Sequence, residues 1–461
     1  MASPLIDEPL SPTGRLFLRP EMNQVIHCVL GVEKPLDVDA VKPLIRDAFL
    51  LKHPRFRSLM VRDRRGLERW RRTSVDLDRH LIVVDRRLSS SSDEAAVNEY
   101  LADMSTGPGL SADKPLWEIH FLTAHRCIVF RIHHALGDGI SLMSILLSDC
   151  RMASDPNAVP TVGSTARSDL SKKKRTMWGA VVWLVGVLWF SLVFVVEFLM
   201  RLCWVCDQNT VISGGIGVEH WPRKLATARF RLEDMKIVKR AVASATINDV
   251  LFGVISSGLS RYLEHRTPKA LQEGLKITGL AMVNLRKQRG LQELSELMKG
   301  DSQSRWGNKF GIVLLPIQYH KSGADPLQPV KRAKTMLDRK KQSLEAHFSY
   351  NVLSYVIAYI GSKIAGFLNY RVICHTSFTI SNIVGPQEDI AIGDNRVTYV
   401  RANSSSLPHA LTMHMVSYAG RADMQILVAK DIIPDPEFLA KCFEDALSEM
   451  KEEASAIMKT F

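Results

Sequence analysis

The spacing of hydrophobic and polar residues along the chain predicts strands and helices in an irregular alternation. Short apolar or alternating runs are typical of strands, and apolar residues at helical spacing are typical of amphipathic helices. In the first part of the chain we expect strands near residues 23–29, 116–122 and 127–132, and helices near residues 38–51, 93–103 and 139–149. Strands mixed with helices in this way indicate an α/β fold.

The second part of the chain shows the same mixture of patterns. Thr246 is a candidate N-cap for a long apolar-periodic segment. The expected strands lie near residues 228–233, 276–283, 310–318, 378–383, 397–402 and 424–428, and the expected helices near residues 235–243, 247–263 and 435–451. The pattern predicts an N-terminal lobe at residues 1–170, a hydrophobic linker at 171–206 and a C-terminal lobe at 207–461.

The linker contains a long apolar segment. Residues 177–196 carry no charged side chain, and as a helix they would be about 30 Å long, enough to cross the hydrocarbon core of a bilayer. Their tryptophans suit a membrane interface, and a basic cluster before them marks its own side as cytosolic. This cluster consists of Lys172, Lys173, Lys174 and Arg175. We therefore expect membrane association.

A second apolar segment lies at residues 352–368. Its pattern fits a buried helix, a second membrane-facing helix, or the wall of an acyl-chain tunnel. Periodicity alone does not choose among these three.

Composition narrows the class of protein. The 461 residues are 46% hydrophobic and 23% charged, which is typical of a large globular chain of two domains or lobes. The net charge of +12 suits nucleic acid, an acidic membrane surface or a phosphate-bearing small molecule. No nucleic-acid-binding module accompanies it, so we expect no nucleic acid partner. The seven scattered cysteines resemble reduced thiols, and Cys203 and Cys206 lack the further ligands of a zinc site.

The stretch FRIHHALGDGISLM, residues 130–143, carries the candidate chemistry. His133 and His134 follow a predicted strand, where neighbouring side chains point to opposite faces, so the two histidines have different roles. The remaining histidines lack metal-ligand spacing, and no GxSxG motif is present, so neither a metal site nor a serine hydrolase is expected. A single histidine acting as general base remains, with Asp138 holding the loop through an arginine.

The motif HHALGDG resembles the HHxxxDG signature of the CoA-dependent acyltransferase superfamily. Nearly the whole chain resembles one branch, the wax ester synthase/diacylglycerol acyltransferase family in its plant form. The supporting stretches are PLWEIHFL, TINDVLFGVISSGLSRYL, MVNLR, GNKFG, SNIVGP and SYAGRADM, in that order. The resemblance implies a two-lobed α/β fold with an active-site tunnel between the lobes. It also implies transfer of a fatty acyl group from acyl-CoA to a long-chain alcohol or to diacylglycerol, without a separate cofactor.

The family pattern also implies residue roles. His134 corresponds to the general base, His133 supports it, Asp138 has a structural role and Gly139 belongs to the loop. By analogy Asp138 pairs with Arg286.

Four further residues match family motifs without a settled role. Asn248 and Asp249 match a motif near the active site, although helix capping or packing explains them equally well. Ser381 and Asn382 could donate hydrogen bonds near the oxyanion, or could belong to a structural turn.

The same fold without catalysis is the main alternative, as a lipid-binding or membrane-tethering protein. An aromatic acyltransferase is a second alternative. Enzymes of that kind have an HxxxD motif and a DFGWG loop, and no DFGWG stretch occurs in this sequence. If both lobes build one active site, a single spanning helix cannot separate them. We therefore expect monotopic attachment to the endoplasmic reticulum membrane with the active site facing the cytosol. The plasma membrane is the alternative location.

Overall fold

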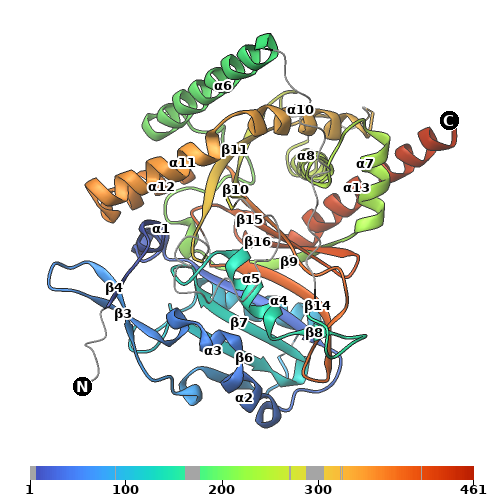
Figure 1. Cartoon of the computed structure of the whole chain (residues 1–461). Coiled ribbons are helices and arrows are strands. Elements are labelled where there is room, and N and C mark those ends of the chain that lie inside the picture. Colours follow the sequence, from blue (N-terminus) through green and yellow to red (C-terminus); the bar gives the residue numbers. More distant parts are fainter. Residues whose placement is uncertain are drawn as a thin grey trace.

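The computed structural model describes residues 7–460 except 89, 161–176, 269–270, 287–305, 322, 324 and 406. Two mixed β-sheets, each with helices packed on it, form two lobes that lie against each other (Figure 1). The predicted two-lobed α/β fold is therefore confirmed. The basic cluster at residues 172–175 lies outside the described residues.

The first sheet has seven strands in the order β5-β6-β7-β2-β14-β13-β8, and a small sheet β1-β4-β3 lies beside it. Its strands are β2 (Val25–Val32), β5 (Leu81–Val84), β6 (Trp117–Leu122), β7 (Cys127–His133), β8 (Arg151–Met152), β13 (Ile390–Ile392) and β14 (Asn395–Ser404). The small sheet contains β1 (Glu8–Pro9), β3 (Ser58–Arg62) and β4 (Glu68–Arg72). The helices of this lobe are α1 (Pro12–Leu16), α2 (Val38–Asp47), α3 (Phe49–Lys52), α4 (Asp93–Thr106) and α5 (Gly139–Ser148).

Two strands of the first sheet come from the far end of the chain. β14 pairs antiparallel with β2, with Ala402 opposite Cys28 and Ser404 opposite Ile26, and β13 continues the sheet to β8. A division of the chain at residue 207 therefore does not separate the two sheets completely.

The second sheet has six strands in the order β11-β10-β12-β15-β16-β9. They are β9 (Arg223–Arg231), β10 (Lys276–Asn284), β11 (Phe310–Gln318), β12 (Phe378–Val384), β15 (Leu411–Tyr418) and β16 (Arg421–Ala429). The helices are α7 (Leu232–Ala241), α8 (Ile247–Arg266), α10 (Gln328–Gln342), α11 (Glu345–Tyr355), α12 (Ser362–Cys374) and α13 (Pro436–Thr460).

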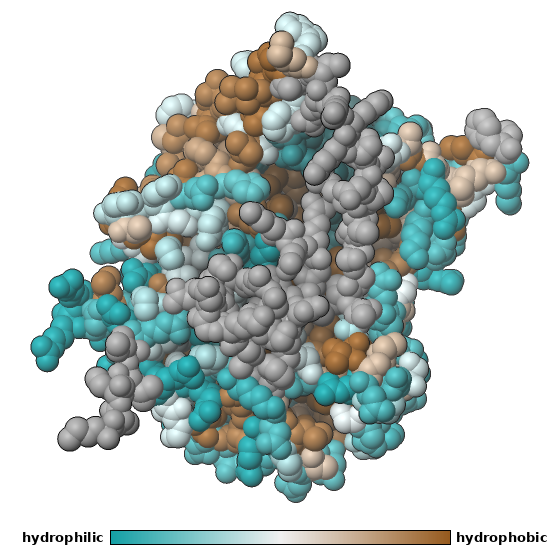
Figure 2. Space-filling model, in the orientation of Figure 1, coloured by the Kyte–Doolittle hydropathy of each residue, from teal (hydrophilic) through white to brown (hydrophobic). Residues whose placement is uncertain are grey.

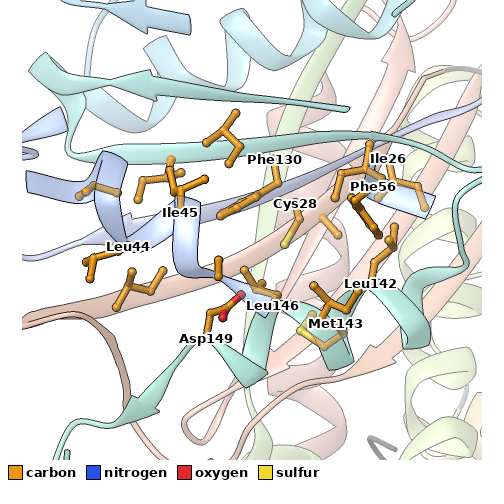
Figure 3. A pocket seen from close by; sticks show the side chains of 18 of the residues that line it. Ile26, Cys28, Leu44, Ile45, Phe56, Phe130, Leu142, Met143, Leu146 and Asp149 are labelled. Carbon is orange, nitrogen blue, oxygen red and sulfur yellow. The ribbon is translucent and has the colours of Figure 1, made fainter. Parts of the chain in front are cut away.

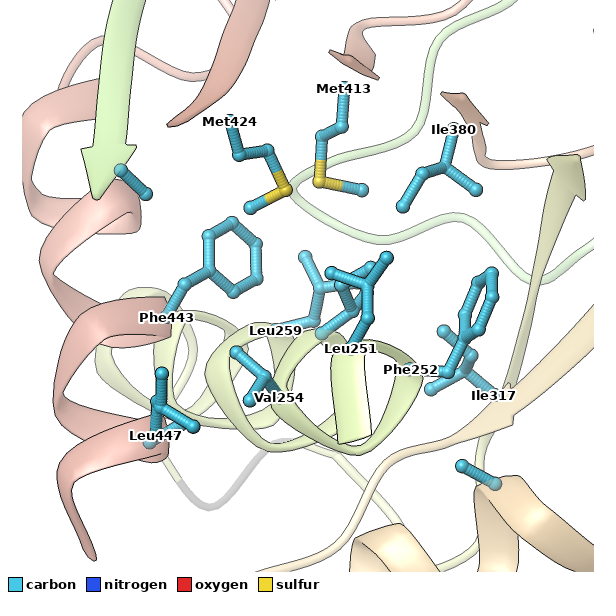
Figure 4. Packing of buried hydrophobic residues seen from close by; sticks show 14 of the residues in the cluster. Leu251, Phe252, Val254, Leu259, Ile317, Ile380, Met413, Met424, Phe443 and Leu447 are labelled. Atoms are coloured by element: carbon cyan, nitrogen blue, oxygen red, sulfur yellow. The ribbon is translucent and has the colours of Figure 1, made fainter. Parts of the chain in front are cut away.

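The core of this lobe lies between the sheet and helices α8 and α13. Figure 4 shows Leu251 and Leu259 of α8 facing Phe443 of α13, with Met413 and Met424 of the sheet above them. These side chains are fully buried, and burial of such side chains stabilises a fold by about 1.5–3 kcal/mol each.

The predicted apolar linker forms helix α6 (Met177–Cys203), which lies along α10, α11 and α12 on the second lobe (Figure 1). Within the described residues it is the one helix long and apolar enough to cross a membrane, over Val181–Cys203 with a mean hydropathy of 2.4. Only one stripe of α6 is buried against the lobe, and most of its large apolar side chains are exposed. An association of α6 with a membrane is consistent with this exposure.

The apolar segment at residues 352–368 is not one buried helix, which corrects the first of the three expectations. α11 ends at Tyr355, a π-helix covers Val356–Ile360, and Gly361 at φ 110° breaks the chain direction before α12. A positive φ of this size strongly favours glycine. Ile357 is buried while Tyr359 is 82% exposed, so the segment has one packed and one outward face.

Candidate active site

The signature loop, residues 133–139, joins the end of β7 to the start of α5. Asp138 is the N-cap of α5, because its Oδ1 accepts the Ser141 N–H at 3.0 Å. Its Oδ2 accepts hydrogen bonds from Arg286 Nη1 at 2.7 Å and from the Lys309 N–H at 3.0 Å. The expected pair of Asp138 and Arg286 is therefore present and buried.

Arg286 also ties the loop to the second lobe. Its guanidinium donates to the Gly307 carbonyl oxygen at 2.5 Å and to Ser141 Oγ at 2.9 Å. Both carboxylate oxygens of Asp138 accept hydrogen bonds, from the Ser141 N–H, from Arg286 and from the Lys309 N–H. Asp138 therefore fixes the shape of the loop.

His133 is buried and uses both ring nitrogens within the protein. Nδ1 accepts the Ala135 N–H at 3.1 Å, so Nε2 carries the proton and donates to Asn23 Oδ1 at 2.8 Å. Burial lowers the pKa of His133 to about 3, and the ring is therefore neutral at pH 7. Its geometry fits a residue that supports the loop.

His134 is held by Asn308, from the segment before β11. The amide Nδ2 of Asn308 donates to the His134 carbonyl oxygen at 2.8 Å, which turns Oδ1 toward the ring. That oxygen is 2.9 Å from His134 Nδ1, so Nδ1 carries the proton and Nε2 keeps its lone pair. The ring also stacks on Phe17, with centroids 4.0 Å apart.

The remaining nitrogen of His134 is available. Within the described part of the chain no hydrogen bond to Nε2 is present, and the residue is partly exposed. Burial lowers the pKa of His134, which outweighs the opposing effects of the nearby Asp138 charge and of Asn308. A neutral imidazole with a free lone pair can accept a proton from a hydroxyl group.

An apolar cavity of about 310 Å³ adjoins the signature loop (Figure 3). It lies in the first lobe, between the sheet and helices α2 and α5. Its lining includes Gly139 of the loop and Ile383 of β12, so the second lobe closes part of it. A Cβ on Gly139 would come within 2.8 Å of Ile383 Cδ1, which explains why glycine fits this point of contact. The cavity suits an alkyl chain.

The four other candidates lie on α8 and β12 of the second lobe. Asp249 forms a capping box with Thr246 at the start of α8, which supports the capping interpretation. Asn382 Nδ2 donates to Asn248 Oδ1 at 2.8 Å. Ser381 lies in β12, opposite His414 of β15. In the described residues no hydrogen bond links these side chains to His134.

Sequence reasoning gave no role to Asn308 or Phe17. Asn308 is part of the quoted GNKFG stretch, which was a usable signal, whereas nothing in the spacing near Phe17 indicates a contact with His134. Among the described residues no group of three or more His, Cys, Asp or Glu side chains could hold a metal ion.

Comparison with known proteins decides the family. The model of the wax ester synthase/diacylglycerol acyltransferase catalytic domain matches residues 33–251, and that of the WS/DGAT C-terminal domain matches residues 306–451. The chain belongs to the wax ester synthase/diacylglycerol acyltransferase family. It is thus placed among acyltransferase enzymes.

Individual relatives agree with the family models. Wax ester synthase/diacylglycerol acyltransferases 11 and 2 of Arabidopsis thaliana are each 34% identical, covering 98% and 97% of this chain and 96% of their own length. The solved wax ester synthase/diacylglycerol acyltransferase from Marinobacter aquaeolei VT8 covers 97% of this chain and 100% of its own, with a TM-score of 0.61 at 16% identity. The starter condensation domain of rhizomide synthetase, solved with C8-CoA and Leu-SNAC, covers 97% of this chain and 94% of its own, with a TM-score of 0.56 at 12% identity. These two structures share the fold.

Proposed function

We propose that this enzyme transfers a fatty acyl group from acyl-CoA to the hydroxyl group of a long-chain alcohol, with diacylglycerol as a second acceptor. The observation that carries the proposal is the state of His134, whose Nδ1 proton is held by Asn308 while Nε2 has no hydrogen-bond partner among the described residues. Membership of the wax ester synthase/diacylglycerol acyltransferase family supports the choice of donor and acceptors.

The reaction needs one proton transfer in each direction. Nε2 of His134 accepts the hydroxyl proton while the hydroxyl oxygen forms a bond to the thioester carbonyl carbon. The tetrahedral oxyanion collapses, the carbon–sulfur bond breaks, and the imidazolium gives its proton to the CoA thiolate. The products are an ester and free CoA, and His134 is neutral again. No acyl-enzyme forms, so both substrates are bound together.

The apolar cavity beside Gly139 holds one of the two alkyl chains in this proposal. Its walls are aliphatic and aromatic side chains of the first sheet and of α5, among them Phe130, Leu142 and Leu146 (Figure 3). Removal of such a chain from water is favourable by about 0.8 kcal/mol for each buried methylene group.

We also propose that α6 attaches the enzyme to the cytosolic face of the endoplasmic reticulum in a monotopic manner. Arg201 of α6 donates to the His375 carbonyl oxygen and pairs with Asp207. This end of α6 is therefore bound to the second lobe. The contact supports monotopic attachment, in which α6 lies beside the two lobes.

The test uses the full chain in membranes, labelled acyl-CoA and both acceptors, with the neutral lipid products resolved. His134→Ala should lower ester formation ~10²- to 10⁴-fold, because the general base is removed. His220, whose side chain is 80% exposed, provides the matched control, and His220→Ala should keep wild-type activity. Wild-type turnover by His134→Ala would refute the proposal.

The same assay separates the alternative function. A lipid-binding protein that keeps the fold without catalysis would bind acyl-CoA equally well with and without His134 and would form no ester. Ester formation that depends on His134 excludes it.

A further inference from the structure

Helix α6 has two faces that its sequence does not show. Val187, Ser191, Phe194 and Arg201 recur at helical spacing, and they face the second lobe. Ser191 Oγ accepts the Leu344 N–H at 3.2 Å, and Phe194 packs edge-on against Phe348 of α11. This contact stripe follows the helix for about 20 Å. α6 thus lies lengthwise on the protein.

The opposite face of α6 exposes a row of large apolar side chains. Trp189 is 61% exposed, and the other members are Trp178, Val182, Val185, Leu188, Leu192 and Leu199. Figure 2 shows apolar side chains gathered over this helix. An exposed apolar surface of this extent marks an interaction site.

A second apolar group lies at the turn between α11 and α12, the two helices that contact α6. We call this group the α11–α12 corner, which covers residues 355–367. Tyr359 is 82% exposed, and Tyr355, Ile360, Ile364 and Phe367 are also exposed. α11 contacts α6 at Phe348 and α12 contacts it at Arg371, so along each helix the corner begins about two turns or fewer from α6 (Figure 1). Tyrosines beside aliphatic side chains are typical of the bilayer interface.

A basic helix borders this apolar surface. α10 contacts α6 and contains six lysines and arginines and one aspartate. Arg332 and Arg339 are exposed and form no ion pair within the described residues. Basic residues beside an inserted apolar face attract anionic headgroups.

The corner also lies close to the catalytic residues. Its inner side chains Ile357 and Ala365 pack in one buried cluster with Leu16 of α1. The next residue, Phe17, stacks on His134. A bilayer that holds the corner would therefore lie beside the helix that covers the general base.

We propose that the α11–α12 corner inserts into the bilayer together with α6, with α10 over anionic headgroups, so that the lipid acceptor reaches His134 from the membrane past α1. This inference rests on the proposed function and names its membrane-facing entrance. The occupant of the surface is a lipid bilayer.

The test compares the full-length double variant Tyr359→Asp/Ile360→Asp with wild type. In flotation at limiting lipid, with vesicles of phosphatidylcholine and phosphatidylserine, the double variant should bind at least about 10-fold more weakly than wild type, because two inserted apolar side chains are lost. Ester formation from a long-chain alcohol in the vesicles should fall in parallel. Ester formation from a short, water-soluble alcohol should stay at the wild-type rate.

Two further variants make the result specific. Val83, on β5 of the first lobe, is also exposed, and Val83→Asp should leave vesicle binding unchanged. Phe367→Asp tests the corner independently if the double variant does not fold.

Each contrary outcome is distinct. Wild-type flotation of both corner variants would overturn the inference. If the corner variants instead bound vesicles normally but no longer self-associated in detergent, the surface would be assigned to a second copy of the chain. Failure of wild type to form any ester would contradict the proposed function, and flotation would still test the surface.

Discussion

At the scale of residues, one amide decides which nitrogen of His134 can act. Asn308 donates to the His134 carbonyl oxygen and accepts from Nδ1, so the orientation of the amide and the tautomer of the ring determine each other. Asn308 is thus a positioning residue, which acts on the substrate through His134.

Replacement of Asn308 should change the pH dependence of catalysis. The rate falls as pH drops through the His134 pKa, which burial keeps below the ordinary value of about 6.5. Asn308→Asp places a carboxylate beside Nδ1 and favours the imidazolium, so the acid limb of kcat/KM should move to higher pH. A profile of kcat/KM between pH 5 and 9 measures this limb. Asn157→Asp, at an exposed position, is the control and should not move it.

At the scale of elements, the cavity between the first sheet and α5 should set the chain length of the substrate. The side chain of Cys28 points into this cavity from β2 (Figure 3). Cys28→Phe fills part of the space and should shift the preference to shorter chains, whereas Cys28→Ala should extend it. Competition among acyl-CoA and alcohol chain lengths measures the shift. Identical chain-length profiles in both variants would contradict the assignment.

Much of this local structure could be predicted from the sequence. The strand before His133 and the helix after Asp138 have clear periodicity and a capping residue, and they form as expected. β15 was missed because its residues are buried on both faces and show little alternation. α10 was missed because its many basic residues resemble a solvated segment. The segment at 352–368 was taken as a unit because periodicity does not reveal the break at Gly361.

The site was predictable only where its residues are adjacent in sequence. His133, His134 and Asp138 lie in one motif, and Arg286 was reached by resemblance alone. Asn308 is 174 residues from His134, and only the three-dimensional structure shows their contact.

At the scale of the whole molecule, buried histidines link stability to pH. Burial lowers the pKa of His27, His53 and His133 to about 3, and that of His409 and His414 to about 4. These rings are neutral in the folded protein, whereas in the unfolded chain they bind protons below pH 6.5 or so. The contribution of these neutral rings to the free energy of unfolding is therefore fully present above about pH 6.5 and is lost as pH falls toward 4.

The expected size of this effect is large. Each buried histidine should remove about 2 kcal/mol of unfolding free energy at pH 5 relative to pH 7. Thermal unfolding at pH 7, 6 and 5 should show a steep fall in Tm. The lowered pKa of Glu118, about 2, acts only in more acidic solution and does not affect this range. A constant Tm between pH 7 and 5 would contradict the assignment of neutral rings.

The pairing of β14 with β2 has a consequence for biosynthesis. Ile26 finds its neighbour Ser404 only after most of the polypeptide has left the ribosome, and long-range strand pairing is intrinsically slow. Until then, β2 presents an open edge on a partly formed sheet, which is a common starting point for aggregation. Helix α6 emerges well before that pairing can form, so its early capture by a membrane would shelter the nascent chain while the last strands arrive.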